Sequence, residues 1–107
     1  MAQFVRVAKV EEVPEGEARV FALGELRLAL CKVEGAFYCV EDICSHDDGP
    51  LGEGCLVGHE IECPRHGARF DVRDGKVTRM PAAAPVESFA VKVEDGQVLV
   101  QVDEEEL

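Results

Sequence analysis

Residues 44–67 read CSHDDGPLGEGCLVGHEIECPRHG, and this stretch decides how the rest of the chain is interpreted. It begins with Cys44-Ser45-His46 and ends with Cys63-Pro64-Arg65-His66-Gly67, and sixteen residues separate His46 from Cys63. Each end therefore offers one thiol and one imidazole. The glycines and prolines between and beside them allow sharp turns, which can direct backbone N–H groups inward. The stretch predicts two loops that bind one metal centre together.

Two thiolates and two imidazoles suit either a tetrahedral zinc ion or an iron–sulfur cluster with mixed ligands. The spacing favours the cluster. Zinc sites commonly pair like ligands, Cys with Cys and His with His, about two to five residues apart. Here each close pair is mixed, and only Ser45 stands between Cys44 and His46. A mixed pair on each of two loops serves a cluster in which two cysteines hold one iron and two histidines hold the other.

The pattern Cys-x-His, sixteen residues, Cys-x-x-His resembles the ligand motif of the Rieske family. The resemblance implies one [2Fe–2S] cluster per chain as the cofactor. It also implies the ligands, which are the metal-binding and cofactor-binding residues we expect: Cys44, His46, Cys63 and His66. No residue is expected to be catalytic.

Four positions depart from the pattern of high-potential Rieske proteins. Those proteins have a disulfide between the cluster loops, at positions that match Gly49 and Arg65 here. They also donate hydrogen bonds to sulfur from a Ser and a Tyr, at positions that match Ala68 and Phe70. Hydrogen bonds to sulfur stabilise the more negative reduced state, so their absence lowers the potential. The chain therefore resembles the low-potential ferredoxins of bacterial aromatic-ring dioxygenase systems.

The segments outside residues 44–67 are typical of an all-β protein, with turn signals at Gly24-Glu25, Glu34-Gly35 and Asp95-Gly96. We expect one short helical turn within residues 11–16. The resemblance implies a single Rieske domain over residues 1–107, an antiparallel β-sandwich or barrel with a cluster-binding subdomain inserted at about residues 42–79. The expected strands are residues 3–7, 18–23, 26–33, 36–40, 60–63, 69–72, 86–93 and 98–102.

The net charge of −11 argues against nucleic acid and anionic membrane surfaces as partners, because both attract Lys and Arg. The chain has no apolar run long enough for a spanning helix, and we expect a cytoplasmic monomer. In a reducing compartment, cysteines outside the ligand pattern are expected to be free. We interpret Cys31 and Cys39 as buried apolar side chains, and His59 as an exposed residue at a hairpin tip.

An electron carrier fits these residues better than an enzyme. The mononuclear iron of Rieske oxygenases needs further ligands, commonly two His and a carboxylate, and only His59 remains after His46 and His66. No G-x-G-x-x-G motif follows a strand, so a dinucleotide-binding reductase is not predicted. We expect one-electron delivery from a flavin reductase to a Rieske-type oxygenase. The alternatives are a zinc-binding interaction module, a Rieske-like subunit of a nitrite reductase, or a ferredoxin of iron–sulfur assembly.

Overall fold

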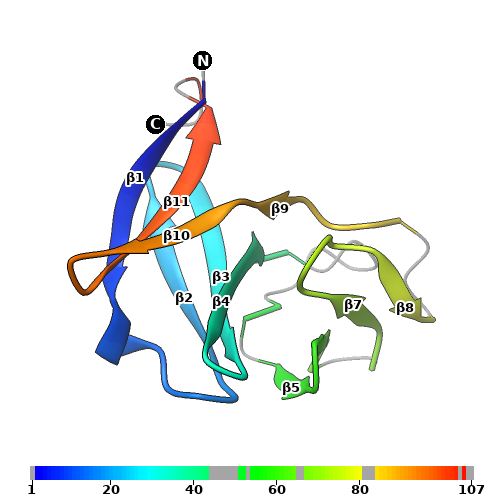
Figure 1. Ribbon diagram of the computed structural model, residues 1–107. Coiled ribbons are helices and arrows are strands. Elements are labelled where there is room, and N and C mark those ends of the chain that lie inside the picture. The colour runs from blue at the N-terminus through cyan, green and yellow to red at the C-terminus, as the bar shows by residue number, and fades with distance from the viewer. Residues whose placement is uncertain are drawn as a thin grey trace.

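The computed structural model describes residues 2–43, 51–52, 54–64, 67–80, 84–103 and 105. In this part of the chain the secondary structure is antiparallel strands with one short 3-10 helix, so the all-β expectation is confirmed (Figure 1). The elements are β1 (Ala2–Lys9), η1 (Val10–Glu12), β2 (Ala18–Leu23), β3 (Leu26–Val33), β4 (Ala36–Glu41), β5 (Cys55–Val57), β6 (Glu60–Glu62), β7 (Arg69–Asp71), β8 (Val77–Arg79), β9 (Ser88–Phe89), β10 (Val91–Glu94) and β11 (Gln97–Asp103).

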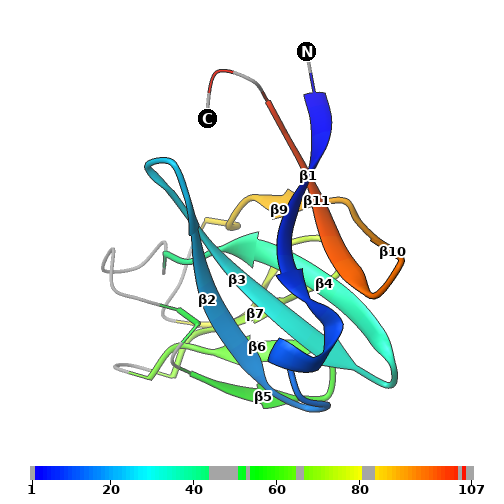
Figure 2. The same ribbon diagram turned by 90° about the vertical axis from the view of Figure 1, so that its left-hand side faces the viewer.

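The strands form three sheets in the described residues. A terminal sheet has the order β1-β11-β10, a central sheet has the order β2-β3-β4-β9, and an outer sheet has the order β5-β6-β7-β8. Figures 1 and 2 show the terminal and outer sheets on either side of the central one. No helix in the described ranges is long and apolar enough to cross a membrane.

Strand β3 shows why the central sheet is the middle layer. Its side chains alternate between two apolar cores: Leu28 and Leu30 pack with the terminal sheet, while Ala29 and Cys31 pack with the outer sheet. All four are fully buried. A strand segment buried on both faces needs apolar residues at every position, which is the physical reason for the continuous apolar run Leu28-Ala29-Leu30-Cys31 between Arg27 and Lys32.

The strand expected at residues 86–93 is divided between two sheets. Strand β9 pairs with β4 of the central sheet, and β10 pairs with β11 of the terminal sheet. Ala90 lies between them, and its carbonyl accepts a hydrogen bond from the Gln101 N–H at 2.9 Å. The alternating sequence continues through this point, so periodicity alone does not reveal the change of sheet.

A side chain reinforces the turn between β3 and β4. The Glu15 carboxylate accepts the backbone N–H groups of Gly35 at 2.8 Å and Glu34 at 2.7 Å. These bonds, first that of Gly35, lower the pKa of Glu15. The turn needs this support because both residues have positive φ, 53° at Glu34 and 82° at Gly35, and a glutamate rarely adopts that conformation.

Candidate metal centre

The structure describes one of the four expected ligands. Cys63 directly follows β6 and is 1% exposed. Cys44, His46 and His66 lie outside the described residues, as do Gly49 and Arg65, so the ligand set and the missing disulfide stay predictions. Among the described residues no group of three or more His, Cys, Asp or Glu side chains could hold a metal ion.

Main-chain hydrogen bonds close the segment between β6 and β7, which we call the second loop (residues 63–68). The Cys63 N–H donates to the Ala68 carbonyl at 2.7 Å, and the Gly67 N–H donates to the Cys63 carbonyl at 3.1 Å. Outside this pair, Arg69 Nε donates to a Glu62 carboxylate oxygen at 2.9 Å. The β6–β7 ladder therefore runs straight into the loop and fixes the backbone of Cys63.

The surroundings of Cys63 fit a cluster thiolate. Its side chain belongs to an apolar core with Leu51, Ala68 and Phe70, each of which is fully buried. Limited solvent access and an apolar shell are properties that control the potential of iron–sulfur sites. Neither the Ala68 side chain nor the Phe70 side chain can donate a hydrogen bond to sulfur. The donor set of two thiols and two imidazoles, together with this buried thiol, suits a Rieske cluster.

We call residues 43–50, which contain Cys44 and His46, the first loop. The described residues that follow it, Leu51 and Gly54, approach the end of β6. The Gly54 N–H donates to the Leu51 carbonyl at 3.0 Å. A Cβ atom on Gly54 would collide with the Glu62 carbonyl group, so only glycine permits this approach. The residue that anchors the near end is Asp42, whose role the sequence did not single out. The sequence feature that could have indicated this role is the position of Asp42, an acidic residue directly after an expected strand and two positions before Cys44.

Of the three cysteines outside the ligand pattern, two are buried and one is exposed. Cys31 and Cys39 are buried, on opposite faces of the central sheet. Burial raises the pKa of the Cys31 thiol to about 12, and it raises the pKa of Cys39 further, with a contribution from Cys31. Both thiols are therefore kept protonated and unreactive. Cys55, at the start of β5, is exposed.

His59 is placed in the turn between β5 and β6, as expected, but it is half-buried rather than exposed. Its ring meets the Tyr38 ring edge-on, with the centroids 5.6 Å apart. Its carbonyl accepts the Val72 N–H at 2.8 Å. His59 thus joins the outer sheet to β4, which is a structural role.

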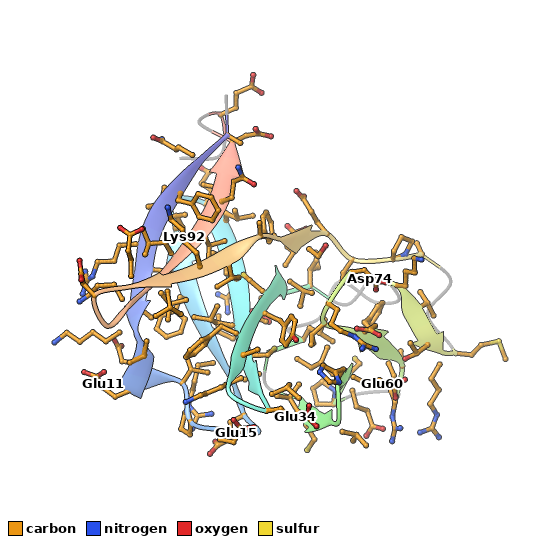
Figure 3. The ribbon with its side chains drawn as sticks, in the orientation of Figure 1. Glu11, Glu15, Glu34, Glu60, Asp74 and Lys92 are labelled. Atoms are coloured by element: carbon orange, nitrogen blue, oxygen red, sulfur yellow. The ribbon has the colours of Figure 1, made fainter. Side chains whose placement is uncertain are left out.

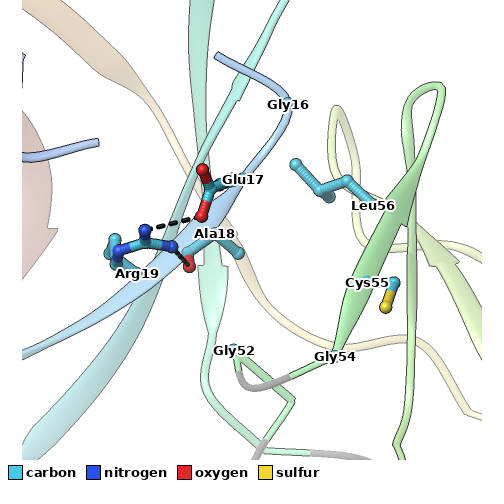
Figure 4. A pocket seen from close by; sticks show the side chains of 8 residues that line it. All are labelled: Gly16, Glu17, Ala18, Arg19, Gly52, Gly54, Cys55 and Leu56. Atoms are coloured by element: carbon cyan, nitrogen blue, oxygen red, sulfur yellow. Dashed lines mark hydrogen bonds and ion pairs between the residues drawn. The ribbon is translucent and has the colours of Figure 1, made fainter. Parts of the chain in front are cut away.

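A cleft lies between the start of β2 and the segment that leads into β5 (Figure 4). Arg19 points toward Glu17 there, with 2.6 Å between Nη2 and the carboxylate, and toward the Ala18 carbonyl. Among the residues labelled in Figure 3, Glu11 and Glu15 lie at the lower edge of the ribbon. The cleft is lined by Gly16, Glu17, Ala18, Arg19, Gly52, Gly54, Cys55 and Leu56.

The layered β-structure and the buried Cys63 are compatible with an iron–sulfur protein, and comparison with known families identifies the class. The family model described as the Rieske [2Fe-2S] domain matches residues 3–90. The chain belongs to the Rieske family, and its cofactor is one [2Fe–2S] cluster.

Within the Rieske family, the chain is similar to ferredoxins of dioxygenase systems. The chain is 40% identical over 104 residues to the ferredoxin component of the p-cumate 2,3-dioxygenase system of Pseudomonas putida, covering 95% of this chain and 88% of the relative. The ferredoxin of carbazole 1,9a-dioxygenase from Nocardioides aromaticivorans IC177 superposes with a TM-score of 0.87 at 32% identity, covering 92% of this chain and 96% of that one. A chain from a complex of reduced oxygenase and oxidized ferredoxin in carbazole 1,9a-dioxygenase superposes with a TM-score of 0.84 at 36% identity, covering 91% of each.

Proposed function

We propose that this protein is a one-electron carrier that receives electrons from a flavin reductase and delivers them to a Rieske-type oxygenase. The cluster would be held by Cys44, His46, Cys63 and His66, in a cluster-binding subdomain of about residues 42–79 within a single domain. The protein would act as a monomer in the cytoplasm.

The observation that carries this proposal is the sequence similarity, over most of the chain, to ferredoxin components of dioxygenase systems. Such a component consists of little more than the cluster domain, so its activity is electron transfer between proteins. The solved complex with an oxygenase supports the same kind of partner here.

The histidine count supports a carrier over an oxygenase. The chain has three histidines, and the proposed cluster ligands account for two. The third, His59, packs against Tyr38 in the β5–β6 turn. A mononuclear iron site with two histidines and a carboxylate therefore cannot be assembled from this chain.

The chain's own contribution is ligation, shielding and presentation. A bound [2Fe–2S] cluster supplies reversible one-electron chemistry. The main-chain pairing of Cys63 with Ala68 fixes one thiol, and the buried Leu51, Ala68 and Phe70 keep water from it. Without hydroxyl donors at residues 68 and 70, we expect a low potential, which suits transfer toward an oxygenase.

Electron paramagnetic resonance of the anaerobic, dithionite-reduced protein tests the cofactor. We expect a rhombic signal with an average g below the free-electron value. The reduced protein is then mixed with an oxidised ring-hydroxylating oxygenase, and stopped-flow absorbance follows its reoxidation. Fast reoxidation supports the carrier function, and reoxidation no faster than in buffer contradicts it.

The same samples separate the alternatives. A colourless protein with stoichiometric zinc would replace the carrier with a zinc-binding interaction module. A chain that copurifies with a nitrite reductase and does not reduce the oxygenase would favour the subunit alternative, although all four proposed ligands are present here.

A further inference from the structure

Among the residues that the structure describes, the buried charged residue is Asp42, and its side chain is fully inaccessible to solvent. An ionised carboxylate removed from water costs much free energy unless hydrogen bonds and an opposite charge compensate it. Both are present. Oδ1 accepts the Leu51 N–H at 2.9 Å and the Gly52 N–H at 2.6 Å. Oδ2 lies 3.2 Å from Nη2 and 3.3 Å from Nε of Arg27.

These bonds connect the residues that flank the first loop. Asp42 directly precedes residues 43–50, and Leu51 and Gly52 directly follow them. One carboxylate oxygen therefore joins the residues on either side of the segment that contains Cys44 and His46. In the described residues, this connection is made by a side chain rather than by a strand ladder.

Packing around Gly52 and a backbone hydrogen bond of Asp42 both hold the contact between Asp42 and Gly52 in place. A Cβ atom on Gly52 would collide with the Val20 side chain and would lie 3.1 Å from Asp42 Oδ1. Gly52 is therefore pressed between the central sheet and the carboxylate. On the other side, the Asp42 N–H donates to the Arg27 carbonyl at 2.9 Å, which ties Asp42 to the start of β3.

Arg27 is the exposed member of the pair. Its side chain is 62% accessible, although it supplies the countercharge to a carboxylate that water does not reach. Substitution of Arg27 therefore removes a positive charge without opening a cavity. The two charges can be removed one at a time, which makes their effects separable.

We propose that Asp42 and Arg27 form a positioning pair for the first loop, in which Asp42 fixes the loop ends and the balance of the two charges contributes to the reduction potential of the centre. This inference rests on the proposed ligands Cys44 and His46. Removing a negative charge near the centre favours the reduced state, and removing a positive charge disfavours it, because reduction adds an electron.

The first test measures the reduction potential by titration monitored at visible wavelengths. Asp42→Asn keeps an oxygen acceptor and loses the charge, so the potential should rise. Arg27→Gln should lower it, and the double variant should fall between the two. Arg6→Gln removes the same charge from β1 of the terminal sheet and is the matched control, with an unchanged potential.

The second test measures iron release to excess chelator. Loss of an outer-shell partner commonly weakens metal binding by about tenfold or more, so Asp42→Ala should release iron about tenfold faster than the wild type. Asp42→Asn should rescue most of that loss, since its amide oxygen can still accept the two N–H groups. If Asp42→Ala does not fold, the opposite potential shifts of Asp42→Asn and Arg27→Gln decide the matter.

The inference is overturned if Asp42→Asn and Arg27→Gln fail to shift the potential in opposite directions, or if Asp42→Ala releases iron at the wild-type rate. The wild-type spectrum tests the proposed function separately. A wild-type protein without an iron–sulfur spectrum would contradict the proposed ligands and the proposed function. A normal wild-type spectrum, together with variants whose reduction potentials are unshifted, would overturn this inference alone.

Discussion

One side chain, that of Asp42, joins the residues on either side of the first loop, whereas main-chain pairing of Cys63 with Ala68 closes the second. A main-chain hydrogen bond needs no particular side chain, because every residue except proline offers the same donor and acceptor. Within the second loop, the positive φ of 76° at Gly67 favours glycine at that one position. A side-chain closure depends on one residue and on the glycine that makes room for it. The first loop is therefore the more sensitive of the two to substitution in its supports.

The largest expected effect follows from the second loop itself. Cys63→Ser should lose the cluster, because the proposed thiolate is removed while its backbone closure remains. Iron and acid-labile sulfide content and visible absorbance measure the loss, and thermal stability should also fall since metal binding contributes to folding. Cys55→Ser, at an exposed cysteine, should keep full iron content. A Cys63→Ser protein with the wild-type spectrum would show that this cysteine is not a ligand.

The next effect tests the side-chain closure of the first loop. Gly52→Ala places a methyl group against Val20 and Asp42, and overpacking of this kind typically costs about 1–3 kcal/mol. The thermal unfolding midpoint should fall and iron release should accelerate. Adding Val20→Ala should recover part of the loss, because it removes the nearest atom.

The matching substitution beside the second loop is Arg69→Gln at the start of β7, which removes the ion pairs with Glu62 and Glu60 and leaves the Cys63–Ala68 pairing intact. Partly exposed ion pairs contribute little, so iron release should stay close to the wild-type rate. Equal acceleration in Gly52→Ala and Arg69→Gln would contradict the difference between the loops.

A smaller effect depends on pH, at the far end of the β6–β7 unit. Arg73 donates side-chain hydrogen bonds to Asp71, and these lower the pKa of that carboxyl. Because the folded-state pKa lies below the unfolded value of about 3.9, the ionised form stabilises the fold above that pH. This contribution is lost as the pH falls through the folded-state pKa.

Asp71→Asn should therefore lower the thermal midpoint by a few degrees at pH 7, and the difference from wild type should shrink below about pH 4. Asp74→Asn, at an exposed carboxylate near Lys76, is the control and should change little. A difference from wild type that is the same at both pH values would exclude an electrostatic origin.

The last prediction concerns the reduction potential of the cluster and the side chains beside Cys63. Ala68→Ser with Phe70→Tyr adds two hydroxyl groups beside the second loop, at positions that are fully buried. If these hydroxyls reach sulfur, they stabilise the reduced state, and the potential should rise with iron content unchanged. Potentiometric titration of the single and double variants measures the rise. An unchanged potential would mean that neither hydroxyl faces a sulfur atom.

Much of the fold was predictable because it depends on neighbours in sequence. The strands β2, β3 and β4 and their turns at residues 24–25 and 34–35 lie where apolar runs and turn residues predict them. The short β5 and β8 were not predicted, because three-residue strands give too little periodicity to recognise. His59 was predicted to be exposed, and its contact with Tyr38 requires β4 and the β5–β6 turn, which are distant in sequence, to meet.

The sequence by itself determined the family, the all-β class and the kind of metal centre, because ligand types, ligand spacing and strand hairpins are local properties. The tertiary structure decided which sheet each half of residues 86–93 joins and which core each face of β3 enters. It also decided the role of Asp42. A carboxylate becomes an anchor only when folding brings Arg27, Leu51 and Gly52 around it and removes the water that would otherwise solvate it.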